Sequence, residues 1–600
     1  MIIKQQFSLI LIGLITLLNP SCQTEKADWQ IADIPIKTQW AESIDSQNPW
    51  PEYPRPQLVR NQWSNLNGLW KYTIQANGLD SPTEWEGDIL VPYPVESALS
   101  GVKKQVGKDS VLWYHRQFTL PAVWKNKRIL LHFEAVDWMT TVWVNGKKAG
   151  MHKGGYDPFT FDITELLNRF GKQYIKISVW DPTSDGTQPR GKQVNDPGGI
   201  WYTSTTGIWQ TVWLEGVPQS YIESFQLIPD IDNKSYDISV VNKHLEKNDK
   251  IKTLTFLDNN LIDESVFDAS SPQTVAISEL KLWSPKNPQL YDLTIQLLRD
   301  DEVIDEVNTY FGMRKISLEK DENGNPRIFL NNSFVFQNGP LDQGFWPDGL
   351  YTPPSDEAMK FDLDMIKAMG FNMLRKHVKI EPRRFYTWCD KMGILVWQDM
   401  PSGDEYLGRD KPDIERTEES AQQFEWELSR LIKTKFNNPS IVIWVPFNEG
   451  WGQYKTAEIV DLIKDIDTSR LVNSVSGWTD RGVGDMLDLH HYPEPICPEP
   501  EENRAIVLGE FGGLGLALEG HTWVDENWGY RKMQTEQELL QRYEDFYSEV
   551  WRFAKEKGLS AAVYTQISDV ETETNGLITY DRKIIKLDTT ILKRINTGTF

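Results

Sequence analysis

The chain has very few cysteines, and this scarcity excludes two ways of stabilising a small domain. Its 600 residues include three, at Cys22, Cys389 and Cys497. Three thiols so far apart cannot form the disulfide framework of small secreted domains. They also cannot form a structural zinc site, which needs closely spaced pairs of ligands. The fold must therefore be held by hydrophobic cores, for which a hydrophobic content of 40% is ample.

The chain also lacks an excess of positive charge and, beyond its N-terminal end, long apolar runs. Its formal net charge is −23 and its pI is near 4.9. Because nucleic acids are bound through basic surfaces, this balance argues against a nucleic-acid partner. No internal repeat or low-complexity tract is present, and a length of 600 residues predicts several domains.

Residues 1–22 have the pattern of a targeting signal. Lys4 precedes an apolar stretch that ends at Leu18 and is too short to span a membrane as a mature helix. The segment is similar to a bacterial lipoprotein signal, which predicts cleavage before Cys22 and lipid on its sulfur; an ordinary secretory signal is the alternative. Either way we expect an exported protein in the periplasm or cell envelope, on the membrane only through a lipid anchor. Residues 23–50 are expected to be a polar linker.

Two apolar segments in the C-terminal half each end in a glutamate. Residues 437–451 read NNPSIVIWVPFNEGW, in which a turn and an apolar run lead to Asn448 and Glu449. Residues 505–513 read AIVLGEFGG, with Glu510 after the apolar run. Such short runs predict strands buried on both faces, as in a parallel sheet. Barrel enzymes place their chemistry at the C-terminal tips of such strands.

The paired glutamates suit the hydrolysis of a glycosidic bond, in which one carboxyl protonates the leaving oxygen and the other attacks the anomeric carbon. Both motifs resemble those of glycoside hydrolase family 2, the group of β-galactosidases, β-glucuronidases and β-mannosidases. The resemblance implies that Glu449 is the acid/base and Glu510 the nucleophile. It also implies that Asn448 holds the sugar 2-hydroxyl, and that a retaining double displacement proceeds without a cofactor or a metal.

Hydrophobic periodicity divides the rest of the chain into three domains. Short alternating strands with turn signals predict an all-β domain over residues 51–217, which the resemblance identifies as a jelly-roll sugar-binding-type domain. Residues 218–316 continue this pattern, and the family places an immunoglobulin-like β-sandwich there. Over residues 317–600 strands alternate with helices, which predicts a catalytic (β/α)8 TIM barrel. The predicted fold class is therefore multidomain, with two β-sandwiches followed by a barrel.

The family arrangement places the two glutamates after the fourth and the seventh of eight barrel strands. The first helix is expected to begin after Ser355, which can cap it, and to stop at Gly370. The expected strands are residues 334–339, 371–377, 394–399, 441–445, 471–474, 488–492, 505–510 and 561–566.

Four further side chains are expected in the site from the resemblance. Tyr492, after the sixth strand, would be hydrogen bonded to the nucleophile, although its Pro-rich surroundings also fit a surface turn. His377, at the tip of the second strand, would contact the sugar; two cationic neighbours make a solvated position the alternative. Asp342 and Gln343 follow the first strand and are expected to bind hydroxyl groups.

Aromatic and histidine side chains complete the sequence-based site. Trp201, in a loop of the jelly roll, is expected to be structural first and substrate-lining second. His490 and His491 resemble a metal pair only superficially, because no third ligand stands at a fixed spacing, and no metal is expected. The candidates for stacking on a sugar ring are Trp346, Trp397, Trp451, Trp523 and Trp528.

The loop after the eighth strand bears on which sugar is bound. The β-glucuronidase members grip the sugar carboxylate with Asn-x-Lys before a glycine. This chain reads Glu573-Thr574-Asn575 before Gly576, with an acid in place of the Asn and no Lys. A neutral sugar is therefore favoured, and family frequency favours galactose. We expect an exo-acting β-glycosidase that removes terminal sugars, above all β-galactosides, from an oligo- or polysaccharide. The alternatives are β-glucuronides, β-mannosides or α-L-arabinopyranosides and, in another class, a non-catalytic carbohydrate-binding lipoprotein.

Overall fold

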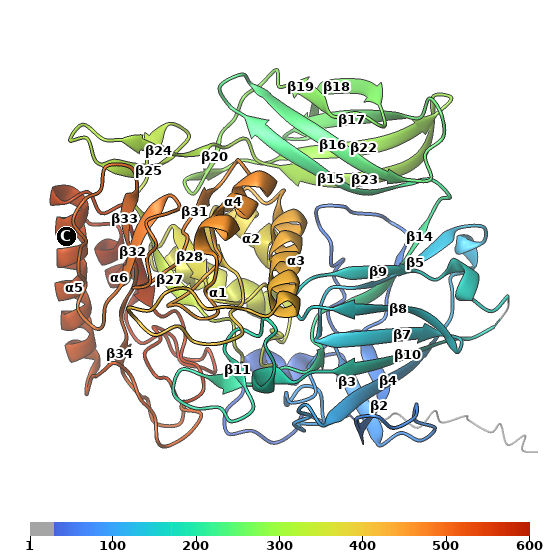
Figure 1. Cartoon of the computed structure of the whole chain (residues 1–600), viewed down its shortest axis with the longest axis horizontal. Coiled ribbons are helices and arrows are strands. Elements are labelled where there is room, and N and C mark those ends of the chain that lie inside the picture. The colour runs from blue at the N-terminus through green and yellow to red at the C-terminus, as the bar shows by residue number, and fades with distance from the viewer. Residues whose placement is uncertain (1–28, 170, 600) are drawn as a thin grey trace, which may run out of the picture.

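The computed structural model describes residues 29–169 and 171–599, so the predicted signal 1–22 and Cys22 lie outside the described residues. Two β-domains pack beside an α/β barrel (Figure 1). In this view the first β-domain is at the lower right, the second lies across the top, and the barrel fills the centre and left. Within the described part of the chain, no helix has the length and apolar content needed to cross a membrane.

The first β-domain is a sandwich of two antiparallel sheets, with strand orders β3-β2-β4-β10-β7-β8 and β1-β14-β5-β9. Strand β10 (Gln173–Trp180) illustrates its construction, because buried Ile175, Ile177 and Val179 alternate with more exposed residues. The other strands of these sheets are β1 (Trp63–Asn65), β2 (Gly68–Ala76), β3 (Gly87–Val91), β4 (Ser110–Phe118), β5 (Arg128–Phe133), β7 (Met139–Val144), β8 (Lys147–Lys153), β9 (Phe159–Asp162) and β14 (Val212–Val217). Four short strands complete the domain: β6 (Val136–Asp137), β11 (Gln193–Val194), β12 (Tyr202–Thr203) and β13 (Gly207–Ile208).

The second β-domain is a smaller sandwich, with strand orders β15-β16-β19 and β18-β17-β22-β23. Its core includes the stacked rings of Tyr291 and Phe311, whose centroids are 5.1 Å apart. Its strands are β15 (Tyr221–Asp230), β16 (Ser235–Lys243), β17 (Lys250–Leu257), β18 (Asn260–Asp268), β19 (Gln273–Ala276), β22 (Tyr291–Arg299) and β23 (Glu302–Phe311), with a short hairpin of β20 (Trp283–Ser284) and β21 (Asn287–Pro288).

A small antiparallel sheet lies between this sandwich and the barrel in the chain. The sequence analysis did not expect this sheet. It consists of β24 (Ile316–Lys320), β25 (Pro326–Leu330) and β26 (Ser333–Phe334). Its buried Ile328 shares a core with residues of the barrel strands, so the sheet covers one end of the barrel. The first barrel strand consequently starts at Gln337 rather than near residue 334.

The barrel is one parallel sheet with the strand order β31-β30-β29-β28-β27-β36-β33-β32. In the described residues β31 and β32 do not pair with each other, so the barrel is nearly closed. Each predicted strand is present: β27 (Gln337–Asp342), β28 (Met373–Lys376), β29 (Leu395–Asp399), β30 (Ile441–Val445), β31 (Leu471–Val472), β32 (Met486–His490), β33 (Ala505–Gly512) and β36 (Ala561–Thr565). The helices are α1 (Asp356–Ala368), α2 (Arg383–Met392), α3 (Glu418–Lys435), α4 (Thr456–Ile466), α5 (Glu536–Glu556) and α6 (Thr589–Asn596), and a short pair β34 (Leu514–Gly515) and β35 (Arg531–Lys532) follows β33.

Local sequence signals explain where these helices begin and end. The hydroxyl of Ser355 accepts a hydrogen bond of 3.1 Å from the backbone N–H of Ala358, which is the predicted N-cap of α1. The chain leaves α1 through Gly370, whose φ of 83° suits glycine best.

Residues 29–50 are not the free linker that their polarity suggested. Trp40, Ala41 and Trp50 are buried, and Thr38 donates two hydrogen bonds, of 2.8 and 2.7 Å, to the buried carboxylate of Asp348. The segment therefore lies against the barrel, because its few large apolar side chains bury more area there than a free tether would allow.

Candidate active site

Glu449 follows β30 in a strained position that points its side chain across the barrel mouth. Its φ is 51°, a left-handed value that costs roughly 1–3 kcal/mol in a residue other than glycine. Its backbone N–H donates to the carbonyl of Ser476 at 2.8 Å, and a Cβ on Gly477 would approach its Cγ to 3.2 Å. The segment after β31 thus holds Glu449 in place, and the absence of a side chain at residue 477 leaves room for it.

Glu510 lies within β33 and is held as a carboxylate. Its side chain is almost fully buried, and Tyr492 donates a hydrogen bond of 2.6 Å to its Oε2, as the sequence predicted. Arg375 donates to its Oε1 at 3.0 Å. Burial by itself raises the pKa of Glu510, but the nearby positive groups, with His490 and Arg375 foremost, outweigh it and lower the pKa to about 2.

Arg375, from β28, connects Glu510 to its surroundings. Besides Glu510, its guanidinium contacts Asp399 at 3.0 and 2.8 Å and the side-chain oxygen of Asn448 at 2.8 Å. Because Arg375 is fully buried, its charge is compensated inside the barrel rather than by water. The solvated cationic cluster considered for this segment is therefore ruled out.

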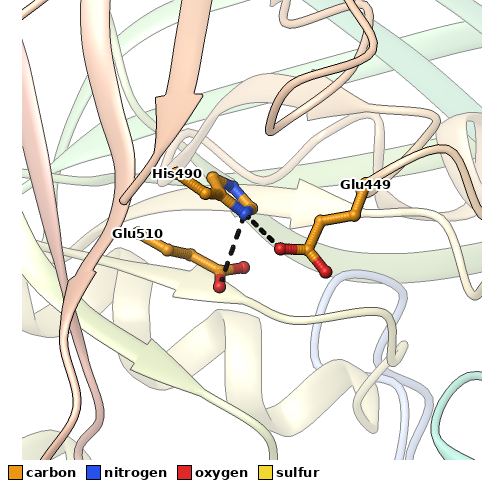
Figure 2. Close-up of side chains that lie close together, drawn as sticks. All are labelled: Glu449, His490 and Glu510. Carbon is orange, nitrogen blue, oxygen red and sulfur yellow. Dashed lines mark hydrogen bonds and ion pairs between the residues drawn. The ribbon is translucent and has the colours of Figure 1, made fainter. Parts of the chain in front are cut away.

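His490, the last residue of β32, stands between the two glutamates (Figure 2). Its Nδ1 is 2.8 Å from Oε1 of Glu449 and 3.5 Å from Oε2 of Glu510. One side-chain atom from each of these three residues lies within 4.8 Å of the others, so three titratable groups meet at one point of the barrel mouth. His491 does not join this group, because its Nδ1 bonds to the backbone carbonyl of Glu494, so the two consecutive histidines do not act as a pair.

A cavity of about 670 Å³ opens above these groups. Two aromatic pairs form its walls: Trp201 stacks on Trp451 with centroids 4.7 Å apart, and Tyr530 stacks on Tyr492 at 3.7 Å. Trp201 comes from the first β-domain, so its role is lining as well as structural. The residues lining the cavity are Ile200, Trp201, Tyr406, Arg409, Glu449, Trp451, Trp478, His490, His491, Tyr492 and Tyr530.

Asn448, Tyr492 and Trp451 gather with the two glutamates as predicted, His377 lies behind Glu510, and the other predicted site residues have other partners. His377 is buried beside Asp399, with its Nδ1 3.9 Å from Oε1 of Glu510, and does not line the cavity.

The two candidates after the first strand are occupied by protein partners. Asp342 is paired with buried Lys376 at 2.6 Å, so its carboxylate is not free to bind a hydroxyl group. The amide nitrogen of Gln343 bonds to Tyr202 and Gln566, and only its oxygen is left without a partner.

The remaining tryptophan candidates do not face the cavity. Trp523 packs edge-on against Tyr580, and Trp346 and Trp397 are buried in cores. Trp528 donates to the backbone of Gly199. These tryptophan rings therefore serve packing within the protein, as expected for many tryptophans of a β-rich protein.

His490 and Arg375 are the residues that the sequence analysis missed. Alternation along β32 could have found the first, because Asp488, His490 and Tyr492 are two residues apart and share a direction. No signal was available for Tyr530, which approaches the cavity from the loop after β34, whereas Trp201 was expected to line the site only as its second role.

A parallel barrel with a buried pair of glutamates at its strand ends, packed beside two β-sandwiches, defines a multidomain protein of the glycoside hydrolase class. Models of one family match three consecutive regions: the sugar binding domain of glycosyl hydrolases family 2 matches residues 63–218, glycosyl hydrolases family 2 matches residues 220–314, and its TIM barrel domain matches residues 354–502. The chain belongs to glycoside hydrolase family 2.

Known relatives differ in the sugar that their names give. A putative β-glucuronidase of Formosa agariphila is 29% identical over 67% of this chain and 48% of that protein. A β-galactosidase of Thermoanaerobacter pseudethanolicus is 27% identical over 68% of this chain and 54% of that protein. The chain thus spans about half the length of these relatives. Among solved structures, a β-D-glucuronidase of Dictyoglomus thermophilum has a TM-score of 0.71 at 19% identity, covering 91% of this chain and 98% of that one.

Proposed function

We propose that the protein is a retaining β-glycosidase, and one observation carries this proposal. Glu449 and Glu510 each place a carboxylate oxygen within 4.8 Å of the other. A retaining mechanism needs carboxyl groups roughly 5–5.5 Å apart, whereas an inverting one needs roughly 6.5–9.5 Å, to leave room for a water molecule. The short separation supports double displacement through a covalent glycosyl-enzyme.

In this mechanism the two glutamates have different tasks because their surroundings differ. Glu510 is buried, ionised and aligned by Arg375 and Tyr492, which suits the nucleophile. Glu449 lines the cavity, where it reaches the leaving oxygen and later a water molecule. The amide nitrogen of Asn448 has no partner among the described residues and is left to bind the sugar.

The form of the cavity supports action on a chain end. A volume of about 670 Å³ walled by stacked aromatic pairs suits one terminal sugar and part of its leaving group. An endo-acting enzyme would need a cleft that a polysaccharide can cross on both sides.

For the sugar, we propose β-galactosides or β-glucuronides. The relatives include both activities by name, and Glu573, which argued against a uronic acid, is occupied by hydrogen bonds from Tyr202 and Asn575. A specific observation favours the glucuronide. Lys192 is 7% exposed, its ammonium is 5.5 Å from the ring of Trp451, and no hydrogen bond or ion pair joins it to any described residue. The carboxylate of Glu573 acts on this ammonium only at longer range, and a sugar carboxylate would give it a direct ion pair.

The test is hydrolysis of a panel of chromogenic glycosides: β-galactoside, β-glucuronide, β-mannoside, β-glucoside and α-L-arabinopyranoside. We expect cleavage of one of the first two, lost in Glu510→Gln and retained in Glu499→Gln, a matched change on the surface. We expect NMR of the released sugar, recorded before it mutarotates, to show the same anomeric configuration as the substrate. Binding without turnover of any glycoside would instead favour the non-catalytic carbohydrate-binding protein.

Export and lipid attachment at Cys22 stay predictions of the sequence. Metabolic labelling with palmitate in a bacterial host, compared between the wild-type chain and Cys22→Ser, tests them. We expect the wild-type protein to carry the lipid label and to associate with the membrane, and Cys22→Ser to do neither. Secretion of an unlabelled wild-type protein would favour an ordinary secretory signal instead.

A further inference from the structure

His490 occupies a position that the roles of the two glutamates do not explain. A single nitrogen, Nδ1, is within reach of both reacting carboxylates, at 2.8 Å from Glu449 and 3.5 Å from Glu510 (Figure 2). The side chain is buried, so water does not compete for this contact. A donor placed between two carboxylates can serve whichever of them carries the negative charge.

The other ring nitrogen indicates the protonation of the imidazole. The hydroxyl of Ser476 donates to Oδ2 of Asp488 at 2.6 Å, so its oxygen is free to accept from Nε2 of His490 at 2.7 Å. Asp488 also accepts from Asn473 and from the backbone N–H of Gly509. With acceptors at both nitrogens, the hydrogen bonds favour a doubly protonated, positively charged ring.

The charges around His490 agree with this assignment. Burial by itself lowers the pKa of His490, but the carboxylates of Glu510, Glu449 and Asp488 raise it above its ordinary value.

The remaining groups that face the ring act at longer range or oppose each other. Asp399 is a further acid near it. Arg375 is a cation whose Nη1 is 3.3 Å from Nε2; because a guanidinium can only donate, this longer contact competes with the 2.7 Å contact to Ser476 and is not a hydrogen bond when Nε2 carries a proton. His377 also faces it, but burial and the charge of Lys192 hold the pKa of His377 well below its ordinary value, so that it stays neutral.

We propose that His490 is a positioning residue whose Nδ1–H is shared by the two carboxylates: it bonds to Glu449 in the structure and shifts toward whichever glutamate carries the negative charge of the reaction. The inference rests on the proposed glycosidase function and adds a residue that serves both of its steps. In the first step an oxygen of Glu510 bonds to the anomeric carbon, the glycosidic C–O bond breaks, and the leaving oxygen takes the proton of Glu449. The charge has then moved from Glu510 to Glu449.

The second step reverses this transfer. Water loses a proton to Glu449 and bonds to the anomeric carbon, the ester bond to Glu510 breaks, and Glu510 is again a carboxylate. The proton on His490 stays on the ring throughout, and only its hydrogen-bond partner changes. Because Nδ1–H contacts Oε1 of Glu449, the other oxygen remains available to carry the acid proton to the leaving group.

The first test needs no activity. Nitrogen NMR of the protein labelled at histidine, with His490→Asn to assign the signal, is expected to show both ring nitrogens protonated at neutral pH. In Glu510→Gln, which removes one neighbouring charge, the ring should lose its proton at a lower pH. A neutral His490 in the wild-type protein at neutral pH would overturn the proposal.

The second test measures the two steps separately, with aryl glycosides of poor and of good leaving ability. His490→Leu is expected to slow both steps by roughly 10–100-fold, the range for hydrogen bonds to charged groups. His490→Asn, which keeps a neutral donor near the Nδ1 position, should recover part of this loss. In both variants the acid and alkaline limbs of kcat/KM should move to higher pH, because both carboxyl groups lose a neighbouring positive charge.

The control is His521→Asn, the same change at a histidine that pairs with Asp581 at 2.8 Å outside the site, and it should alter neither limb. A uniform loss of rate in His490→Leu with unmoved limbs would mean a merely structural role and overturn the proposal. A wild-type protein that cleaves no glycoside overturns the proposed function instead, and the NMR result then decides the charge of His490 alone.

Discussion

Nη2 of Arg375 donates a hydrogen bond of 2.8 Å to the side-chain oxygen of Asn448. A guanidinium can only donate, so this contact fixes which end of the amide faces Arg375. The amide nitrogen of Asn448 is therefore turned away, buried and without a partner among the described residues. The arginine that also holds Glu510 thus leaves Asn448 with a spare donor, which the proposed mechanism assigns to the sugar.

Asn448→Ala should lower kcat/KM by roughly a hundredfold or more, because hydrogen bonds to the 2-hydroxyl contribute several kcal/mol in the transition state. The measurement is kcat/KM on matched glycosides with and without the 2-hydroxyl. On the 2-deoxy substrate the variant and the wild-type protein should differ little, since no partner remains to be lost. An equal deficit on both substrates would place the effect of Asn448 elsewhere.

Tyr492→Phe should raise the pKa of Glu510, because it removes one of the donors that stabilise the ionised form. A nucleophile with a raised pKa is protonated at higher pH, so the acid limb of kcat/KM should move upward and the first step should slow roughly 10–100-fold. The check is a pH profile of kcat/KM. Tyr454→Phe, which breaks a hydrogen bond to Glu425 away from the cavity, is the control and should leave the acid limb in place.

Lys192→Met should separate the two candidate sugars. If the ammonium binds a sugar carboxylate, kcat/KM for the β-glucuronide should fall roughly 10–100-fold, as expected for a charge-assisted hydrogen bond, while that for the β-galactoside stays nearly unchanged. Lys153→Met, at an exposed lysine paired with Glu419, is the matched control. Equal losses on both sugars would show that Lys192 only supports Trp451.

Glu427→Gln should stabilise the protein at mildly alkaline pH. Burial, reinforced by Asp157, raises the pKa of Glu427 from 4.5 to about 8, and its Oε2 has no partner among the described residues. Between these two pH values the unfolded chain carries this charge and the folded chain does not, so folding becomes less favourable as the pH rises.

Thermal unfolding at a pH below 4.5 and at one above 8 checks this prediction for Glu427→Gln. The gain should be small at the acid value and on the order of 1–3 kcal/mol at the alkaline one. Glu418→Gln, in the exposed first turn of α3, should give no such pH dependence. A gain that is equal at both values would point to packing rather than charge.

Features that depend on local sequence could be predicted. Apolar runs such as Ile441–Val445 predict strands because five residues between turn signals are too few for a helix, whereas a strand of a parallel sheet is buried on both faces. Glu449 and Glu510 follow such runs, and the parallel sheet then brings their side chains to one end of the barrel.

Features that depend on pairing across the chain could not be predicted. Arg375 and Lys376 look like solvated cations in sequence, and their burial becomes possible only with Asp399 and Asp342 on neighbouring strands. Residues 29–50 look like a tether, because the surface that buries Trp40 and Trp50 is formed by distant parts of the chain. A segment that is polar on average can still pack against the protein when a few large aromatic rings make the contacts.

The stacked pair of Trp201 and Trp451 spans the boundary between the first β-domain and the barrel. In the proposed mechanism the two carboxylates thus belong to one domain, while one wall of the cavity belongs to another. A barrel produced without the first β-domain would retain Glu449 and Glu510 but lose Trp201, one ring of this stacked pair. We expect that mutating the loop of the first β-domain that carries Trp201 alters which substrates are accepted, without any change to Glu449 or Glu510.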